Sequence, residues 1–344
     1  MTKFCPLLII FLLLTSFNRL FSTEINDTSA NLLFTRAFAL GGAFTGVKDE
    51  IESSLYNPAA AKSIGIGGNN LLFYFNPVSA GVAAANLSEL SINRERGYKD
   101  LIAMLGLILR SISVAPGPFK FSFVLTEDLD GNPYRLDTNQ YFTTEKILDW
   151  HYHLASARIQ LARQVSIGAS LFFFNMTETA GEDIRLKTLV GTNYGILVSP
   201  ADRFSVGISF FNIPAEAEES MYHLHQIHHQ SINFGLAYQP FTNLRLAVDF
   251  RNLSEEDANS GGELHGGIEV VPFSFLALRS GYFHDHAYQT NNFTVGLGIA
   301  DFRTYKPVTE SLVFSKILLN YGLQFHEKAD DNYLSHQMTL LIRL

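Results

Sequence analysis

Polar and apolar residues alternate one by one along this chain, in repeated runs of about ten residues. The clearest runs are Phe204–Phe210, Ile232–Tyr238, Leu244–Phe250 and Phe293–Ile299, in which every second residue is large and apolar. Successive side chains of a β-strand point to opposite faces, so each run predicts a strand with one apolar and one polar face. No run after the N-terminus is long enough for a membrane helix of about 20 residues.

Counting all such runs gives about fourteen candidate strands, an even number, as single-chain bacterial barrels have. They begin near Asn70, Ser79, Phe119, Trp150, Val165, Ile184, Arg203, His229, Leu244, Glu263, Ser274, Asn291, Leu312 and Tyr333. We therefore expect an all-β fold, a transmembrane antiparallel β-barrel over residues 67–344. Residues 88–118 are too many for a short turn, and they hold either a helix or misassigned strands.

The lengths of the links between these strands indicate an orientation. Tight links at 162–166, 199–203, 239–243 and 271–274 alternate with longer ones, such as 127–149 and 212–228. Outer-membrane barrels have short periplasmic turns and longer outer loops. The pattern therefore places the tight links, and with them both termini, on the periplasmic side.

The first 22 residues carry the features of a secretory signal peptide. Lys3 precedes an apolar stretch at Leu7–Leu14, and small residues follow at Ser22 and Thr23. This stretch is too short for a membrane anchor, so we expect residues 1–22 to be cleaved during export. The single cysteine, Cys5, lies in the signal, and the mature chain then has no disulfide and no thiolate metal site.

A distinctive segment follows the signal, with the sequence TRAFALGGAFTGVKDEIESSLYNPAAAKSI at residues 35–64. Gly41 and Gly42 permit close packing or a positive φ, and Pro58 restricts the preceding Asn57 to an extended conformation. On its own, Asn57-Pro58-Ala59 is also compatible with an ordinary turn that ends a surface helix.

The order of glycine pair, acidic segment and Asn-Pro-Ala motif resembles the N-terminal plug of the FadL-like outer-membrane proteins. This resemblance implies a plug at residues 23–66, with Asn57, Pro58 and Ala59 in the lumen, where they hold the plug at the barrel wall. It also implies passive uptake of hydrophobic small molecules, such as long-chain fatty acids, across a bacterial outer membrane. The wider superfamily includes PorV-type barrels, so a barrel that binds or shuttles exported proteins is the first alternative. A surface receptor or adhesin that uses long outer loops is the second.

Basic residues gather on the face opposite the apolar side chains, which would be the lumen. They are Lys120, Arg158, Arg185, Lys187, Arg245, Arg251, Arg279, Lys316 and Arg343, against only Asp249 and Glu269 as acids. A basic lumen would favour an anionic head group such as a carboxylate. The alternative is that plug acids, such as Asp49, Glu50 and Glu52, pair with these bases.

Histidines form the remaining pattern, and all of them map to outer loops or outer strand ends. Three His-x-His pairs occur, and the pair His223/His225 is extended by His228 and His229. Such side chains could bind one metal ion at the rim, although polar loops also tolerate histidine without any metal.

The rest of the sequence narrows the choice of function. The chain has a formal net charge of −8, which disfavours nucleic-acid binding, and 47% hydrophobic residues with many Phe and Tyr, which suits a barrel. We find no phosphate-binding loop and no nucleophile elbow, so we expect neither an enzyme nor a cofactor. The partners expected are outer-membrane lipid, a hydrophobic ligand and the barrel assembly machinery, for a monomeric protein. The terminal Leu344 departs from the Phe that often ends the closing strand.

Overall fold

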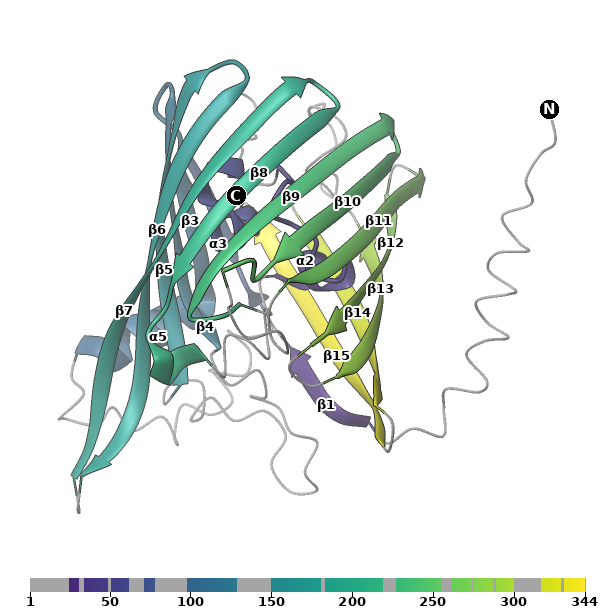
Figure 1. The fold of residues 1–344 in the computed structure, drawn as a ribbon. Helices are drawn as coiled ribbons and strands as arrows, with labels where there is room; N and C mark the ends of the chain where they lie inside the picture. The colour runs from purple at the N-terminus through teal and green to yellow at the C-terminus, as the bar shows by residue number, and fades with distance from the viewer. Residues whose placement is uncertain are drawn as a thin grey trace, which may run out of the picture.

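A single closed sheet forms the body of the protein (Figure 1). The structure, a computed structural model, describes residues 25–30, 34–48, 51–61, 71–77, 98–128, 150–180, 183–218, 227–254, 262–273, 275–286, 289–299, 317–328 and 331–343. The sheet has 15 strands, and the 14 from β2 to β15 pair with their neighbours in sequence order. The last closes on the first, because β15 also pairs with β2. The expected antiparallel barrel is therefore confirmed.

The strands lengthen from the N-terminal part of the wall toward the middle. The first three of the ring are β2 (Leu71–Phe75), β3 (Leu109–Val114) and β4 (Phe119–Asp128). The middle strands are β5 (Trp150–Ala162), β6 (Val165–Ala180), β7 (Asp183–Ala201), β8 (Phe204–Asn212) and β9 (Gln230–Phe241). The last are β10 (Leu244–Arg251), β11 (Glu263–Phe273), β12 (Leu276–Asp285), β13 (Thr290–Ile299), β14 (Ile317–Lys328) and β15 (Asp331–Arg343).

The two faces of the wall follow the predicted alternation. Leu246, Val248 and Phe250 of β10 expose 36–41% of their surface on the outside, whereas the residues that alternate with them, Arg245, Ala247 and Asp249, are buried. The same pattern holds on β8 and β13. A wall with an apolar outer face and a polar inner face is the pattern of a barrel whose outside contacts lipid. Within the described residues, no helix is both long and apolar enough to span a membrane.

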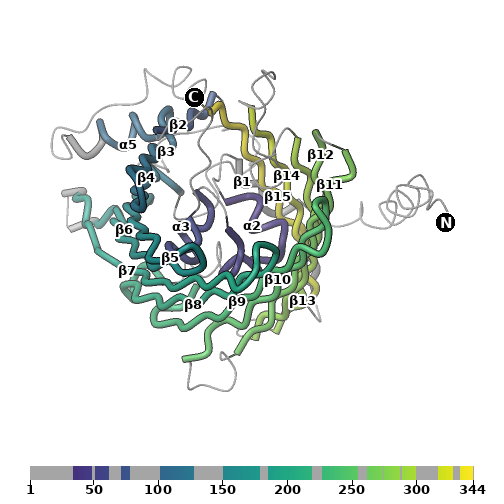
Figure 2. The backbone as a smooth tube through the Cα atoms, turned by 90° about the horizontal axis from the view of Figure 1, so that it is seen from above, coloured from purple at the N-terminus to yellow at the C-terminus, as the bar shows by residue number. Residues whose placement is uncertain are grey.

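Several short helical elements accompany the sheet. Inside the ring lie α2 (Thr35–Ala39), α3 (Ser53–Tyr56) and the 3₁₀ helix η1 (Pro58–Ala60), as the view along the barrel shows (Figure 2). Outside it, α5 (Tyr98–Ile108) packs on β4 and β3. Residues 88–118 therefore hold both of the expected alternatives in their described part, because α5 is followed by β3, a strand that the alternation missed.

The seam between β15 and β2 is short. Among the described residues, Ile342 and Arg343 of β15 pair with β2, and the rest of this edge is open to another partner. β1 (Ile25–Ala30) supplies one, because it pairs in parallel with residues Leu334 to Met338. β1 thus begins at the end of the barrel opposite the tight turns, whereas β15 ends at the tight-turn end, as expected for the C-terminus. Residues 1–24 lie outside the described residues.

The strand ends differ from prediction in several places. The link between β6 and β7 at the end with the longer loops is short, because the two strands pair as far as Ala180 and Asp183. β14 is described from Ile317, and the start expected near Leu312 lies outside the described residues, as do the strand expected near Ser79 and residues 1–22. Below, the end with the links after β5, β7, β9 and β11 is named the turn end, and the opposite end the loop end.

Candidate functional site

Residues 34–48 and 51–61 form one buried unit within the ring, here named the inner segment. All of them are buried except Lys48, which is half-buried. Phe44, Ile51, Leu55 and Tyr56 share one apolar cluster with side chains of the wall, such as Phe172. Short helices and turns leave many backbone groups without partners, so the wall must satisfy them.

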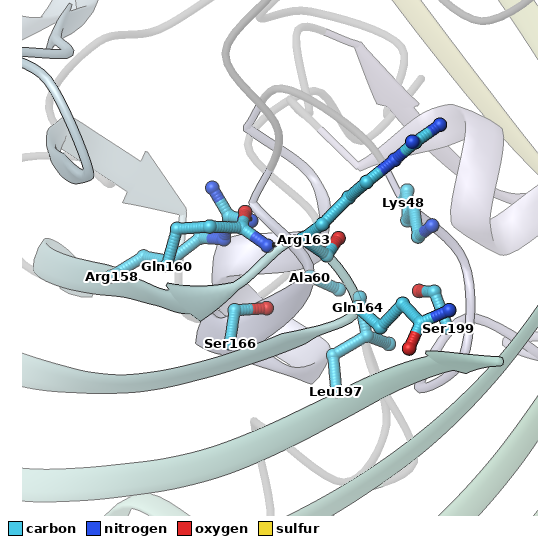
Figure 3. A pocket seen from close by; sticks show the side chains of 9 residues that line it. All are labelled: Lys48, Ala60, Arg158, Gln160, Arg163, Gln164, Ser166, Leu197 and Ser199. Carbon is cyan, nitrogen blue, oxygen red and sulfur yellow. Dashed lines mark hydrogen bonds between the residues drawn. The ribbon is translucent and has the colours of Figure 1, made fainter. Parts of the chain in front are cut away.

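The Asn57-Pro58-Ala59 motif is the point where the inner segment meets β5 to β8. The Asn57 side chain donates to Thr45 O at 2.9 Å and to Ile196 O of β7 at 3.1 Å, and its Oδ1 accepts from Ala59 N at 3.0 Å. Ala59 O in turn accepts from Arg158 Nε at 3.0 Å and from Ser166 Oγ at 2.8 Å; Figure 3 draws both side chains next to Ala60. Asn57 therefore joins two parts of the inner segment and ties them to the wall.

A belt of glycines lets the wall approach the inner segment at backbone distance. A Cβ added to any of them would lie only 2.0–2.8 Å from an atom of the inner segment. They form four cross-strand pairs, Gly168 with Gly195, Gly207 with Gly235, Gly267 with Gly281, and Gly296 with Gly322. We call these eight residues the glycine belt. Any side chain there would occupy space that the inner segment fills, so the belt is shaped for this occupant.

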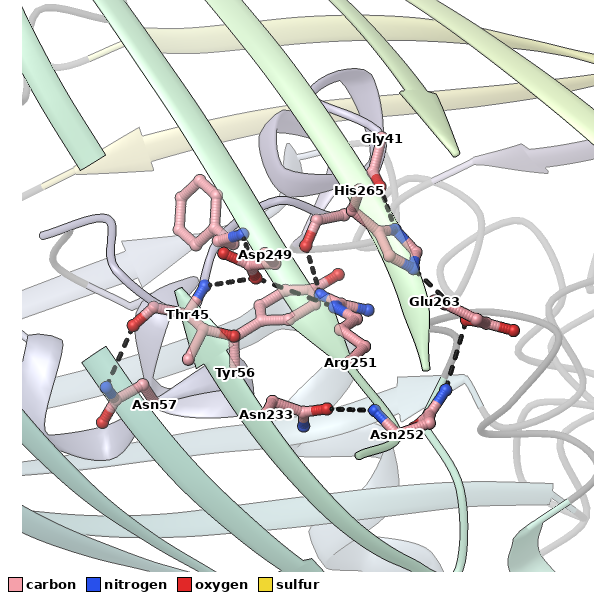
Figure 4. Close-up of polar contacts among 12 residues, drawn as sticks. Gly41, Thr45, Tyr56, Asn57, Asn233, Asp249, Arg251, Asn252, Glu263 and His265 are labelled. Carbon is pink, nitrogen blue, oxygen red and sulfur yellow. Dashed lines mark hydrogen bonds and ion pairs between the residues drawn. The ribbon is translucent and has the colours of Figure 1, made fainter. Parts of the chain in front are cut away.

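Gly41 and Gly42 take positive φ values of 64° and 74°, a conformation that favours glycine. The turn exposes their carbonyl oxygens to the wall. Gly41 O lies 2.6 Å from His265 Nδ1, and Gly42 O accepts a hydrogen bond from Arg251 Nη2 (Figure 4). The pair thus has both roles that its sequence permits, a tight turn and a close approach to the wall.

Asp249 and Arg251 of β10 anchor the middle of the inner segment. Asp249 Oδ2 accepts hydrogen bonds from the backbone N–H groups of Phe44 and Thr45, each at 2.8 Å. The Arg251 guanidinium lies 4.8 Å from the centroid of the Tyr56 ring, a cation–π distance. Burial raises the pKa of the Tyr56 hydroxyl far above its usual value, so the ring stays neutral beneath this cation.

A bidentate ion pair joins Arg36 to Glu269 of β11. Arg36 donates from Nε at 2.8 Å and from Nη2 at 2.7 Å, one bond to each carboxylate oxygen. Arg279 Nε at 2.7 Å and Arg245 Nη1 at 3.3 Å bind the same carboxylate. One buried Glu269 thus holds three arginines, and one of the three belongs to the inner segment. Bidentate arginine–carboxylate pairs are among the strongest hydrogen bonds in proteins.

The pairing of plug acids with wall bases stays a prediction, and this cluster adds a pairing of the opposite sense. The inner segment contributes a base, Arg36, and the wall contributes the acid. Glu52 accepts from Ala37 N at 2.8 Å inside the segment, and Asp49 and Glu50 lie outside the described residues. The wall is also less basic than expected, because Glu263 is a further buried acid, with His265 Nε2 3.2 Å away.

The other predicted basic residues do not gather into one site. Lys120 is buried on β4, opposite Arg158 of β5. Lys187 forms an ion pair at 3.3 Å with Glu216 near the loop end, where Arg185 is exposed. Arg343 is buried near the end of β15, and Lys316 lies outside the described residues.

The described histidines contact protein groups. His228 lies 3.3 Å from Glu218, and His229 bonds to Ile213 O, while His223 and His225 lie outside the described residues. In the part of the chain that is described, no group of three or more His, Cys, Asp or Glu could hold a metal ion.

An aromatic cluster lines the wall beside the inner segment. Tyr152, Phe172, Phe174 and Phe211 are buried, with ring centroids 5.7–6.4 Å apart between neighbours. They belong to β5, β6 and β8 and join the apolar cluster of the inner segment. The polar lumen predicted from alternation is therefore apolar in this sector.

Neither a protein-family model nor the sequence of a curated protein matches the chain. The Pseudomonas putida toluene transporter TodX is similar over 93% of this chain and 98% of that chain, with 11% identity and a TM-score of 0.45. OccK11 of Pseudomonas aeruginosa is similar over 68% and 69%, with 10% identity and a TM-score of 0.36. A triple mutant of the Rhodopseudomonas blastica porin is similar over 68% and 75%, with 7% identity and a TM-score of 0.35.

The chain resembles FadL-like proteins in the order of its parts. An N-terminal segment with the Gly41-Gly42 and Asn57-Pro58-Ala59 motifs precedes a closed barrel, and both motifs contact the wall. Sequence reasoning missed Arg36 and the glycine belt. The belt had a visible signal, since Gly207, Gly235 and Gly296 all fall on the polar face of predicted strands.

Proposed function

We propose that this protein is a bacterial outer-membrane barrel for passive uptake of hydrophobic small molecules, with the inner segment as its plug. The observation that carries the proposal is the way in which the inner segment is bound inside the ring. This position is called the seated state below, and a position in which the segment has left these contacts is called the shifted state. In the seated state, the inner segment fills the ring at the level of the glycine belt and is bound by side chains from several wall strands. A wall shaped around a separate stretch of chain favours a closed resting state, in which no permanent aqueous pore leaks.

The membrane location rests on the outer face of the wall. Side chains such as Phe123, Ile208, Leu246 and Phe293 expose 39–49% of their surface there. A soluble protein rarely exposes an apolar area that continues around its whole girth, whereas a barrel in lipid requires one.

A hydrophobic ligand suits the aromatic sector of the lumen. Tyr152, Phe172 and Phe174 belong to the same apolar cluster as Leu55 and Tyr56 of the inner segment. A shift of the inner segment would expose this surface, and an apolar molecule could take the place of the side chains that leave. The ligand would thereby stabilise the shifted state of the inner segment. Its binding free energy would then drive this movement, so transport needs no other energy source.

Two irregular places in the wall offer routes toward lipid. The register of β4 with β5 shifts between Val124 and Glu127, where Thr126 has a φ of 49°. Among the described residues, β15 pairs with β2 at two positions. We infer that an apolar ligand leaves through the wall or through the lumen, depending on which contact opens first.

Uptake into liposomes tests the proposal. Mature protein should accelerate entry of a hydrophobic fluorescent probe, such as a long-chain fatty acid analogue, while a small charged dye enters no faster than into empty liposomes. Equal rates for the hydrophobic probe with and without the protein would contradict uptake. Stable co-purification with an exported protein would support the PorV-type alternative instead.

A further inference from the structure

A pocket of about 290 Å³ opens at the turn end, between the inner segment and the β5–β6 turn (Figure 3). Three cations line it, Lys48, Arg158 and Arg163, and in Figure 3 Lys48 lies on the opposite side from Arg158. The other described lining residues are neutral, so its charge is positive. The nearest ion pair, Arg163 with Asp202 at 3.7 Å, has both side chains at least 87% exposed and binds weakly.

The pocket has two halves that meet only when the inner segment is in place. Lys48 and Ala60 come from the inner segment, and the remaining lining residues come from β5, β6, β7 and their turn. Arg158 connects the halves, because its Nε donates to Ala59 O at 3.0 Å. The same guanidinium also bonds to the side-chain oxygen of Gln160, which orients it in the pocket.

We propose that this pocket binds the oxyanion head group of an amphiphilic molecule at the turn end, with the carboxylate of a fatty acid as the simplest case. The assignment rests on the proposed uptake function. A concave site with several cations concentrates positive potential, and arginine forms paired hydrogen bonds with a carboxylate. Leu197 and Ala60 are the apolar members of the lining.

The two-sided construction gives the site a further property. A ligand that binds Lys48 and Arg163 together bridges the inner segment and the wall, so it binds the seated state better than the shifted one. Binding must then stabilise the seated state by the same free energy. The molecule that arrives at the turn end therefore favours closure behind it, until it dissociates.

Calorimetry on the detergent-solubilised mature protein tests the site, with octanoate, octanol and inorganic phosphate as probes. Octanoate should bind, and octanol, which has the same chain without the charge, should bind at least about tenfold more weakly. Lys48→Ala and Arg163→Ala should each weaken octanoate binding about tenfold, the loss expected for one hydrogen bond to a charged group. Lys187→Ala removes a cation near the loop end and should leave binding unchanged.

Several outcomes would overturn the assignment. Octanol binding as tightly as octanoate would show that no head group is recognised. Phosphate binding as tightly as octanoate would show a site for free oxyanions rather than amphiphiles. Unchanged octanoate binding in both variants, with normal β-rich circular dichroism, would place the site elsewhere. Liposome uptake is measured in parallel. Uptake without octanoate binding would contradict only the head-group site. Octanoate binding without uptake would contradict only the proposed uptake function.

Discussion

Adding one methyl group to the glycine belt should release the inner segment without disturbing the barrel. In Gly267→Ala, the new Cβ would lie 2.6 Å from Leu40 O and 3.0 Å from Leu40 Cβ. The residue before it provides a matched control, because a Cβ on Gly266 meets only Tyr282 O at 4.0 Å. Both changes add the same group to the same strand, and only one meets the inner segment.

The expected free-energy cost of Gly267→Ala follows from overpacking, which destabilises a structure by about 1–3 kcal/mol when a buried methyl group has no room. The cost applies only to the seated state, since the shifted state has no Leu40 at this position. At about 1.4 kcal/mol per factor of ten, the ratio of shifted to seated protein rises about 5- to 150-fold. Gly281→Ala should have at least as large an effect, because its Cβ would lie 2.2 Å from Gly41 N.

Single-channel recording in planar bilayers measures this ratio as the fraction of time in a conducting state. Gly267→Ala should open far more often than wild type, and Gly266→Ala should match wild type. Both variants should migrate differently on gels with and without boiling, which shows that the barrel is folded. If the two folded variants open equally often, the belt does not hold the inner segment and this reasoning is wrong.

Further substitutions test separate parts of the structure. Leu246→Arg places a charge on the outer face and should destabilise the barrel in lipid by about 2–4 kcal/mol near the midplane, measured by denaturant unfolding. Asn57→Ala leaves Thr45 O and Ile196 O without this donor and should weaken the seat by about 1–3 kcal/mol, read out as faster labelling of a cysteine introduced at Ala37. Glu269→Gln should accelerate the same labelling more than Arg36→Ala, because it removes the charge partner of three arginines rather than one; the reverse order would contradict the assigned role of Glu269.

The alternation of side chains predicted most of the wall because lipid on one side and polar groups on the other constrain every second residue. Ser205, Ser209 and Asn233 face inward as expected, and Ile208 and Ile232 face outward. β3 was missed because it follows the apolar α5 directly and has only six residues. β1 was missed because its sequence, INDTSA, is polar and does not alternate. It pairs with an edge of β15, and no local sequence pattern predicts such a long-range pairing.

The sequence predicted which residues of the inner segment contact the wall, but not which wall residues they contact. The Asn57-Pro58-Ala59 motif and the glycine pair identified which residues contact the wall, because their backbone requirements are local. The partners Ile196 and Glu269 lie more than a hundred residues away, and their height in the barrel depends on the stagger of the intervening strands. For the same reason, the glycines on the polar face of separate predicted strands could not show that they lie at one height and meet as a belt.

The conductance of a barrel without its inner segment tests the central claim most directly. Deletion of residues 36–62 from the mature protein should leave a folded barrel that inserts into planar bilayers and conducts steadily. The wild-type protein should stay closed for most of the recording under the same conditions. A folded deletion variant with the conductance of wild type would show that the inner segment does not close the lumen.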